Sequence, residues 1–168
     1  MKYLRSLFLL LAPLFLFSCL EEEAPAPENY FITQKDGVKW ESEQGASVGL
    51  RKGQDSKDAD SLFIGGHKVD GWVSMSIGFK GVGTYKLPAT GQARYYGLVG
   101  GDVVVSSYKL DKDDGNAEIV ITEWNPDANV IKGTFRFRAR KLTEYSTGSP
   151  ETVNFTQGEF QGKVNSMP

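Results

Sequence analysis

The feature that most constrains this chain is a strict alternation of apolar and polar side chains in residues 130–141. The odd positions from 131 to 139 carry Ile, Gly, Phe, Phe and Ala, and the even positions from 132 to 140 carry Lys, Thr and three Arg. Successive side chains of a strand point to opposite faces, so this segment predicts a β-strand with one apolar and one basic face. An apolar strand face has to be covered by a second layer.

The rest of the chain repeats this pattern in short runs. Residues 117–124 precede the alternating segment across an Asn-Pro-Asp-Ala-Asn turn, which predicts an antiparallel hairpin. Residues 31–34 and 38–41 flank an Asp-Gly turn. Further strands are predicted at residues 62–64, 72–79, 83–87, 94–99 and 103–110, and in a last strand that runs from 152–155 on to 160–164. We therefore predict an all-β fold, an antiparallel β-sandwich, with a closed β-barrel as the alternative.

The last strand carries an irregularity that can be predicted from register. Phe155 and Phe160 are five positions apart, so a regular strand would point them to opposite faces. One extra residue at Gln157 and Gly158 would turn both rings inward, and glycine is common in β-bulges. The sequence predicts a bulge at this point.

The first residues have the organisation of a secretory signal. Basic residues are followed by about a dozen apolar ones and by the small Ser18, directly before Cys19. The apolar run is too short to cross a bilayer as a helix. Leu-Phe-Ser-Cys at positions 16–19 resembles a bacterial lipobox. This resemblance implies cleavage before Cys19 and attachment of lipid to it, including palmitate-type acyl chains. An ordinary signal peptide with a chance cysteine is the alternative.

The segment after Cys19 is acidic and rich in proline, which is typical of an extended tether. Residues 1–18 are thus expected to be a signal peptide, residues 19–29 a lipidated cysteine with its tether, and residues 30–168 one β domain. Leu20 favours the outer membrane. The acidic run resembles surface-export signals of Bacteroidota lipoproteins, so the cell surface is favoured over the periplasmic face. A solvated linker that carries no sorting signal is the alternative.

Composition argues against several classes of function. The 19 basic and 21 acidic residues give a net charge of −2, which does not indicate a nucleic-acid partner. The only cysteine is Cys19 and the only histidine is His67, so neither a nucleophile–base pair nor a zinc site is expected. We predict no enzyme activity, no cofactor and no metal. A hydrolase using Glu118, Glu123 or Glu159 is the less favoured reading.

Two other groups of residues could form a site. Trp72, Tyr95, Tyr96 and Trp124 are predicted as ligand-binding aromatic residues, with packing under loops or in the core as the alternative. The basic face of residues 130–141 is expected to be solvated and paired with acids such as Glu118 and Glu159. The loop at residues 111–116 superficially resembles a calcium loop, but its spacing favours a polar turn.

Three motifs resemble a known family. Gly-Thr-Tyr-Lys-Leu at 83–87, Ile-Lys-Gly-Thr-Phe-Arg-Phe-Arg-Ala at 131–139 and Gly-Glu-Phe at 158–160 are similar to a family of small Bacteroidota lipoproteins with a domain of unknown function. The resemblance implies fold and location and transfers no activity. The predicted function is an outer-membrane-anchored, non-enzymatic binding or accessory module for a protein or glycan. A β-barrel carrier of a small apolar ligand is the alternative.

Overall fold

The computed structural model describes residues 29–54, 59–145 and 148–168, so the predicted signal peptide and Cys19 lie outside the described residues. The described residues form strands and one very short helix. Their bounds are β1 (Tyr30–Lys35), β2 (Val38–Glu41), β3 (Ser47–Arg51), β4 (Asp60–Lys68), β5 (Gly71–Phe79), β6 (Gly83–Lys86), α1 (Leu87–Thr90), β7 (Gly91–Val99), β8 (Val103–Leu110), β9 (Glu118–Asn125), β10 (Val130–Glu144) and β11 (Thr152–Met167). Among the described residues, no helix has the length and apolar character that crossing a membrane requires.

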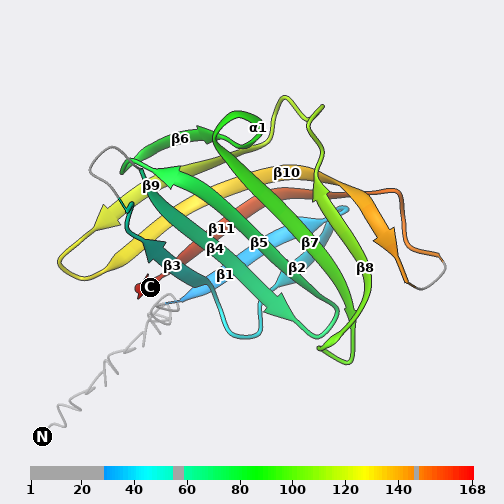
Figure 1. The fold of residues 1–168 in the computed structure, drawn as a ribbon. Coiled ribbons are helices and arrows are strands. Elements are labelled where there is room, and N and C mark those ends of the chain that lie inside the picture. The colour runs from blue at the N-terminus through cyan, green and yellow to red at the C-terminus, as the bar shows by residue number, and fades with distance from the viewer. Residues whose placement is uncertain (1–28, 55–58, 146–147) are drawn as a thin grey trace, which may run out of the picture.

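The strands form one mixed sheet in the order β2-β1-β11-β3-β4-β5-β7-β8-β10-β9-β6, with a further pairing between β10 and β11. The sheet folds over into two layers (Figure 1). We call β3, β4, β5, β7 and β8 the front layer, and β2, β1, β11, β10, β9 and β6 the back layer. The C-terminal ends of β10 and β11 leave the back layer and pair with β8 and β3 of the front layer.

This architecture confirms the predicted all-β sandwich, with one difference in strand direction. β11 and β3 run parallel, whereas every other pair is antiparallel, so the sheet is mixed. The predicted hairpin of β9 and β10 forms, and so does that of β1 and β2. In the second hairpin both Asp36 and Gly37 have positive φ angles, 51° and 81°, as its two-residue turn requires.

The core lies between the layers and contains many aromatic rings from the back layer. Phe31, Phe135, Phe137, Phe155 and Phe160 are at most 3% exposed, and their neighbouring ring centroids lie 4.7 to 6.5 Å apart. Such distances are favourable for aromatic pairs. The front layer covers the rings mainly with aliphatic side chains: Val48, Leu62, Ile64, Val73, Met75 and Ile77. Side chains therefore fill the space between the layers.

The predicted bulge in β11 is confirmed. Thr33 of β1 lies opposite two residues of β11, Gln157 and Gly158, and the extra residue Gln157 has a φ of 50°. Phe155 and Phe160 are therefore both turned into the core. Gly158 has a separate role, because a Cβ atom there would lie 2.6 Å from the ring of Phe135 on β10. The position needs glycine so that this ring can pack flat against the neighbouring strand.

Candidate functional site

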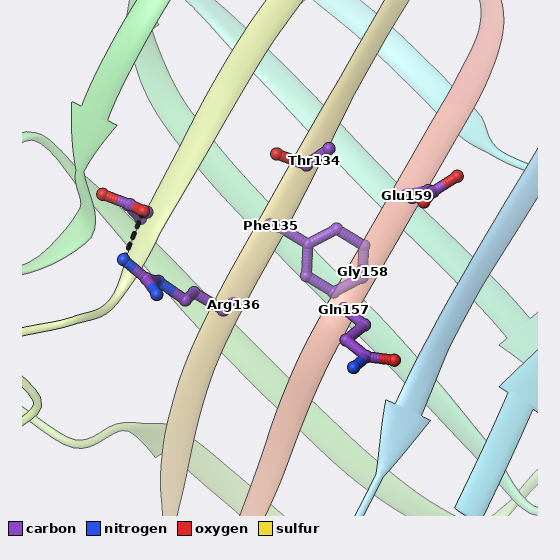
Figure 2. A pocket seen from close by; sticks show the side chains of 7 residues that line it. Thr134, Phe135, Arg136, Gln157, Gly158 and Glu159 are labelled. Atoms are coloured by element: carbon purple, nitrogen blue, oxygen red, sulfur yellow. Dashed lines mark hydrogen bonds and ion pairs between the residues drawn. The ribbon is translucent and has the colours of Figure 1, made fainter.

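A first depression lies on the outer surface of the back layer, at the bulge (Figure 2). Its volume is about 500 Å³, and its lining residues are Glu118, Thr134, Phe135, Arg136, Gln157, Gly158 and Glu159. Figure 2 shows the Phe135 ring passing under Gly158, while the polar side chains stand around it. We call this depression the bulge pocket. It combines a small apolar floor with a charged rim.

The charges of the bulge pocket are paired within the protein. Arg136 Nη2 donates to Glu118 Oε1 at 2.7 Å, the contact drawn in Figure 2, and Lys86 on β6 also forms an ion pair with Glu118. The hydrogen bond from Lys86 holds the pKa of Glu118 below its usual value, desolvation opposes this shift, and the charge of Arg136 adds to it. Glu118 is thus ionised at neutral pH and is a poor proton donor. Glu159 lines the same pocket, whereas Glu123 lies opposite Lys132 on the hairpin.

The remaining arginines of the basic face of β10 are paired with a loop carboxylate. Asp111, only 3% exposed, accepts hydrogen bonds from Arg138 Nε at 2.8 Å and Arg140 Nη2 at 3.1 Å. Burial opposes ionisation, but bonds from the Asp113 amide and from both arginines keep the pKa of Asp111 below its usual value. The sequence predicted Glu118 as a partner of this face but missed Asp111.

The loop at residues 111–116 uses its carboxylates to hold β10. Besides the contacts of Asp111, Asp114 Oδ2 accepts a hydrogen bond of 2.7 Å from the amide of Arg138. In the part of the chain that the structure describes, no group of three or more His, Cys, Asp or Glu side chains is arranged to hold a metal ion. These carboxylates orient toward backbone and arginine groups of the protein itself.

Two of the four predicted aromatic residues meet on the outer surface of the front layer. Trp72 of β5 and Tyr96 of β7 lie directly opposite each other, and their rings stack at 5.5 Å with an angle of 28° between the planes. Trp72 is 47% exposed. Arg94 Nη1 donates to the Tyr96 hydroxyl at 3.3 Å and so lies beside the ring pair. The pair leaves apolar ring surface open to solvent, and we call it the aromatic platform.

The structure places the other two aromatic residues elsewhere. Tyr95 is 4% exposed and belongs to the core, and its hydroxyl donates to the Asp70 carbonyl at 3.2 Å and accepts from Lys35 Nζ at 3.0 Å. Burial raises the pKa of Tyr95, although the hydrogen bond from Lys35 opposes the shift. Trp124 is partly buried and packs edge-on against Phe79 at 5.8 Å. Neither of them adjoins the stacked pair.

A depression lies on each side of the stacked pair. The one that Trp72 borders has a volume of about 340 Å³, and its outward-facing lining residues include Ser47, Gly49, Phe63, Gly65, Trp72, Ser74, Asn165 and Met167. The one that Tyr96 borders measures about 450 Å³, and its lining residues include Arg94, Tyr96, Val104, Ser107, Lys109, Thr143 and Tyr145. The outer surface of the front layer formed by these two sets is called the Trp72 face below.

The Trp72 face is hollow because several outward strand positions carry no large side chain. Gly65 of β4 lies opposite Ser47 of β3 and Ser74 of β5, so three adjacent outward positions carry only glycine or serine. The Trp72 Nε1 atom lies 3.5 Å from the place of a Cβ atom on Gly65, so the indole leans over this glycine. Larger residues there would fill the hollow that the ring borders.

Sequence reasoning missed several residues of this face. Phe63, Arg94, Lys109 and Met167 were not identified as candidates, although all of them line the two depressions. One signal was available, since the outward positions 72, 74, 76 and 78 read Trp, Ser, Ser and Gly. A large aromatic residue followed by small ones on the same strand face indicates a ring that stands above a low surface.

Fold and surface together define a two-layered β-sandwich protein with one exposed aromatic face. The chain belongs to the family described as a domain of unknown function, DUF6252, whose model matches residues 28–163. The resemblance to a family of unknown function is thereby confirmed. Comparisons with curated proteins and with solved structures returned no match.

Proposed function

We propose that this protein is a lipid-anchored, non-enzymatic binding module of the bacterial outer membrane that presents the Trp72 face to a glycan or protein ligand. The observation that carries the proposal is the exposed, stacked pair of Trp72 and Tyr96 with a depression on either side. Trp and Tyr are the side chains that most often dominate binding energy at interfaces. Their flat faces suit both sugar rings and apolar side chains of a partner.

The sequence supplies the argument for the anchor. Cys19 follows a short apolar segment and a small residue, and β1 begins at Tyr30, eleven positions later. Several acyl chains on Cys19 would hold the protein on a membrane without any other contact. An extended tether of this length reaches roughly 35 Å. The domain would therefore present its faces well clear of the lipid surface.

The packed interior favours surface binding over the alternative of a small apolar ligand held inside. The space between the layers is occupied by phenylalanine rings in mutual contact, such as Phe137 and Phe155 at 4.7 Å. A ligand inside would have to displace these side chains, which are close to fully buried. Binding at the surface requires no rearrangement of the core.

Binding by variants of the full-length chain tests the proposed face. The chain is extracted from membranes in mild detergent and screened against polysaccharides and envelope fractions. We expect Trp72→Ala and Tyr96→Ala each to weaken the strongest interaction about tenfold or more. Val38→Ala is the matched control, because Val38 on β2 is 70% exposed in the other layer. An interaction that survives both aromatic substitutions would show that the Trp72 face is not the site.

Cell fractionation tests the anchor separately. The wild-type chain should sediment with the outer membrane, and Cys19→Ser should remove it from the outer-membrane fraction because no lipid can be attached. Protease treatment of intact cells then distinguishes the cell surface, where the β domain is cut, from the periplasmic face, where it is protected. A Cys19→Ser chain that still sediments with the outer-membrane fraction would contradict lipid anchoring.

A further inference from the structure

The Trp72 face carries a row of three cations on adjacent strands. Arg94 of β7 lies directly opposite Lys109 of β8, and Lys109 lies directly opposite Arg140 of β10. Residues directly opposite on antiparallel strands share a face, with Cβ atoms only about 5 Å apart. Like charges in such positions destabilise a sheet. We call Arg94, Lys109 and Arg140 the cation row.

Only one end of the cation row is neutralised by the protein. Arg140 forms ion pairs with Asp111 at 3.1 Å and with Asp113 at 3.7 Å. Within residues 29–54, 59–145 and 148–168, no carboxylate lies within 4 Å of the charged nitrogens of Arg94 or Lys109. Two adjacent cations therefore face solvent without a counter-charge from the described residues.

The two unpaired cations lie beside the aromatic platform. Arg94 contacts the Tyr96 hydroxyl, and Arg94, Tyr96 and Lys109 all line the depression of about 450 Å³. The hydroxyls of Ser107 and Thr143 line the same depression and add neutral hydrogen-bonding groups. A ligand seated on the rings would therefore have its edge within reach of both positive charges.

The aromatic pair and the two cations beside it together favour one class of ligand. Stacked rings match the C–H faces of sugars, and a guanidinium and an ammonium bind carboxylate or sulfate groups strongly. We infer that the Trp72 face binds an acidic polysaccharide, a sugar polymer that carries carboxylate or sulfate groups. The inference rests on the proposed binding function and adds the class of ligand. Charge complementarity between the ligand and the cation row is the reason to prefer this occupant.

The charges of the chain argue against a polynucleotide in the same place. Single-stranded nucleic acids also stack on aromatic rings, but they present one phosphate for every base and require a long basic groove. This chain has more acidic than basic residues, 21 against 19. Two unpaired cations suit a polymer with a carboxylate or sulfate beside a sugar ring that lies on the platform.

The test compares acidic and neutral polymers on the full-length chain in mild detergent. The probes are polygalacturonate, alginate and chondroitin sulfate, with neutral galactan and dextran for comparison. We expect at least one acidic polymer to bind and the neutral polymers to bind at least about tenfold more weakly. The Arg94→Gln, Lys109→Gln double variant should lose about tenfold or more in affinity for the acidic polymer. It should remain folded, because it removes repulsion and no ion pair.

A matched control replaces a cation of the opposite surface. Lys132 on β10 is exposed in the back layer and has no ion pair among the described side chains, so Lys132→Gln should leave affinity within about twofold. Raising the salt concentration should weaken the wild-type interaction and have little effect on the double variant.

The outcomes separate the inference from the function on which it rests. Equal binding of acidic and neutral polymers, lost in Trp72→Ala but kept in the double variant, would overturn the acidic ligand and leave the binding face standing. An affinity for oligo(dT) or for vesicles of anionic lipid equal to that for the acidic polysaccharide would also overturn it, because the surface would then recognise negative charge alone. Failure of every glycan, together with a protein interaction that is indifferent to Trp72→Ala, would remove both proposals.

Discussion

The two outer surfaces of the sandwich follow the same strand alternation, yet they differ in whether their charged side chains form ion pairs within the protein. On the back layer Arg136 pairs with Glu118, and Arg138 pairs with Asp111. On the front layer Arg94 and Lys109 lie opposite each other without a carboxylate partner among the described residues. Exposed aromatic rings are stacked next to these unpaired charges and not next to the paired ones.

The difference indicates which surface serves the fold and which one is available to a ligand. A paired charge has already found its counter-ion, so a ligand must compete with the protein for it. An unpaired charge that repels its neighbour becomes more stable when an anion binds. We therefore interpret the bulge pocket as a structural surface, although it is hollow, and the Trp72 face as a binding surface.

The largest effect that would test the structural role of the back layer is expected from Gly158→Ala. The added methyl group would lie 2.6 Å from the Phe135 ring, so the ring or the strand has to move. Overpacking of this kind costs about 1 to 3 kcal/mol of unfolding free energy, measurable by urea denaturation. Gly115→Ala is the control, because a Cβ atom there meets nothing within 4 Å, and it should change stability by less than about 0.5 kcal/mol. Equal stability of the two variants would contradict the packing of Phe135 against Gly158.

A smaller effect, and a pH dependence, is expected from Glu118→Gln. This substitution removes ion pairs to both Lys86 and Arg136 and should cost about 1 kcal/mol at neutral pH. Because the pKa of Glu118 is lowered in the folded protein, its contribution is present above the unfolded value of about 4.3 and is lost as the pH falls through the folded pKa. The stability difference from wild type should therefore vanish in acid.

Glu159→Gln provides the matched comparison for that pH series. Glu159 lines the same pocket, and no ion pair of this residue is found within the described segments. Its replacement should leave unfolding free energy nearly unchanged between neutral and acidic pH. If the two variants lost stability alike at neutral pH, the pairing on the back layer would not be what distinguishes the two surfaces.

The smallest of these changes in stability should be a gain in unfolding free energy. Lys109→Glu places an acid between Arg94 and Arg140 and should raise unfolding free energy by about 0.5 kcal/mol. High salt should reduce this gain, since the residues are exposed. The same substitution should abolish binding of an acidic polymer. A loss of stability would show that the cation row is not under repulsion.

The sequence could predict features set by neighbours along the chain. The β9–β10 hairpin followed from alternation and a turn sequence, and the bulge at Gln157 followed from the spacing of two phenylalanines. β3 was not predicted, because its run of five residues is short and carries only two apolar side chains, Val48 and Leu50, with Gly49 between them.

Features that depend on strand order could not be predicted. Arg94, Lys109 and Arg140 come from three strands and meet only because β8 pairs with both β7 and β10. The pairing of Asp111 with Arg138 joins residues 27 positions apart, through a loop whose direction alternation does not specify. The candidate site was thus half predicted: the ring pair was named, but the charges and hollows around it were not.

The position of β11 in the sheet has a consequence for how the molecule reaches its folded state. This strand pairs with β1, β3 and β10, and it joins residues as far as 131 positions apart, Tyr30 with Gln161. Contacts between such distant residues form slowly, because a large loop has to close before they contribute. Until residues 152–167 are available, β1 and β3 lack their shared neighbouring strand. Phe135 and Phe137 of β10 then also lack the rings of β11 that pack against them. A nascent or truncated chain without this segment should therefore remain incompletely folded. It should be cleaved readily by proteases and be able to pass through a narrow pore.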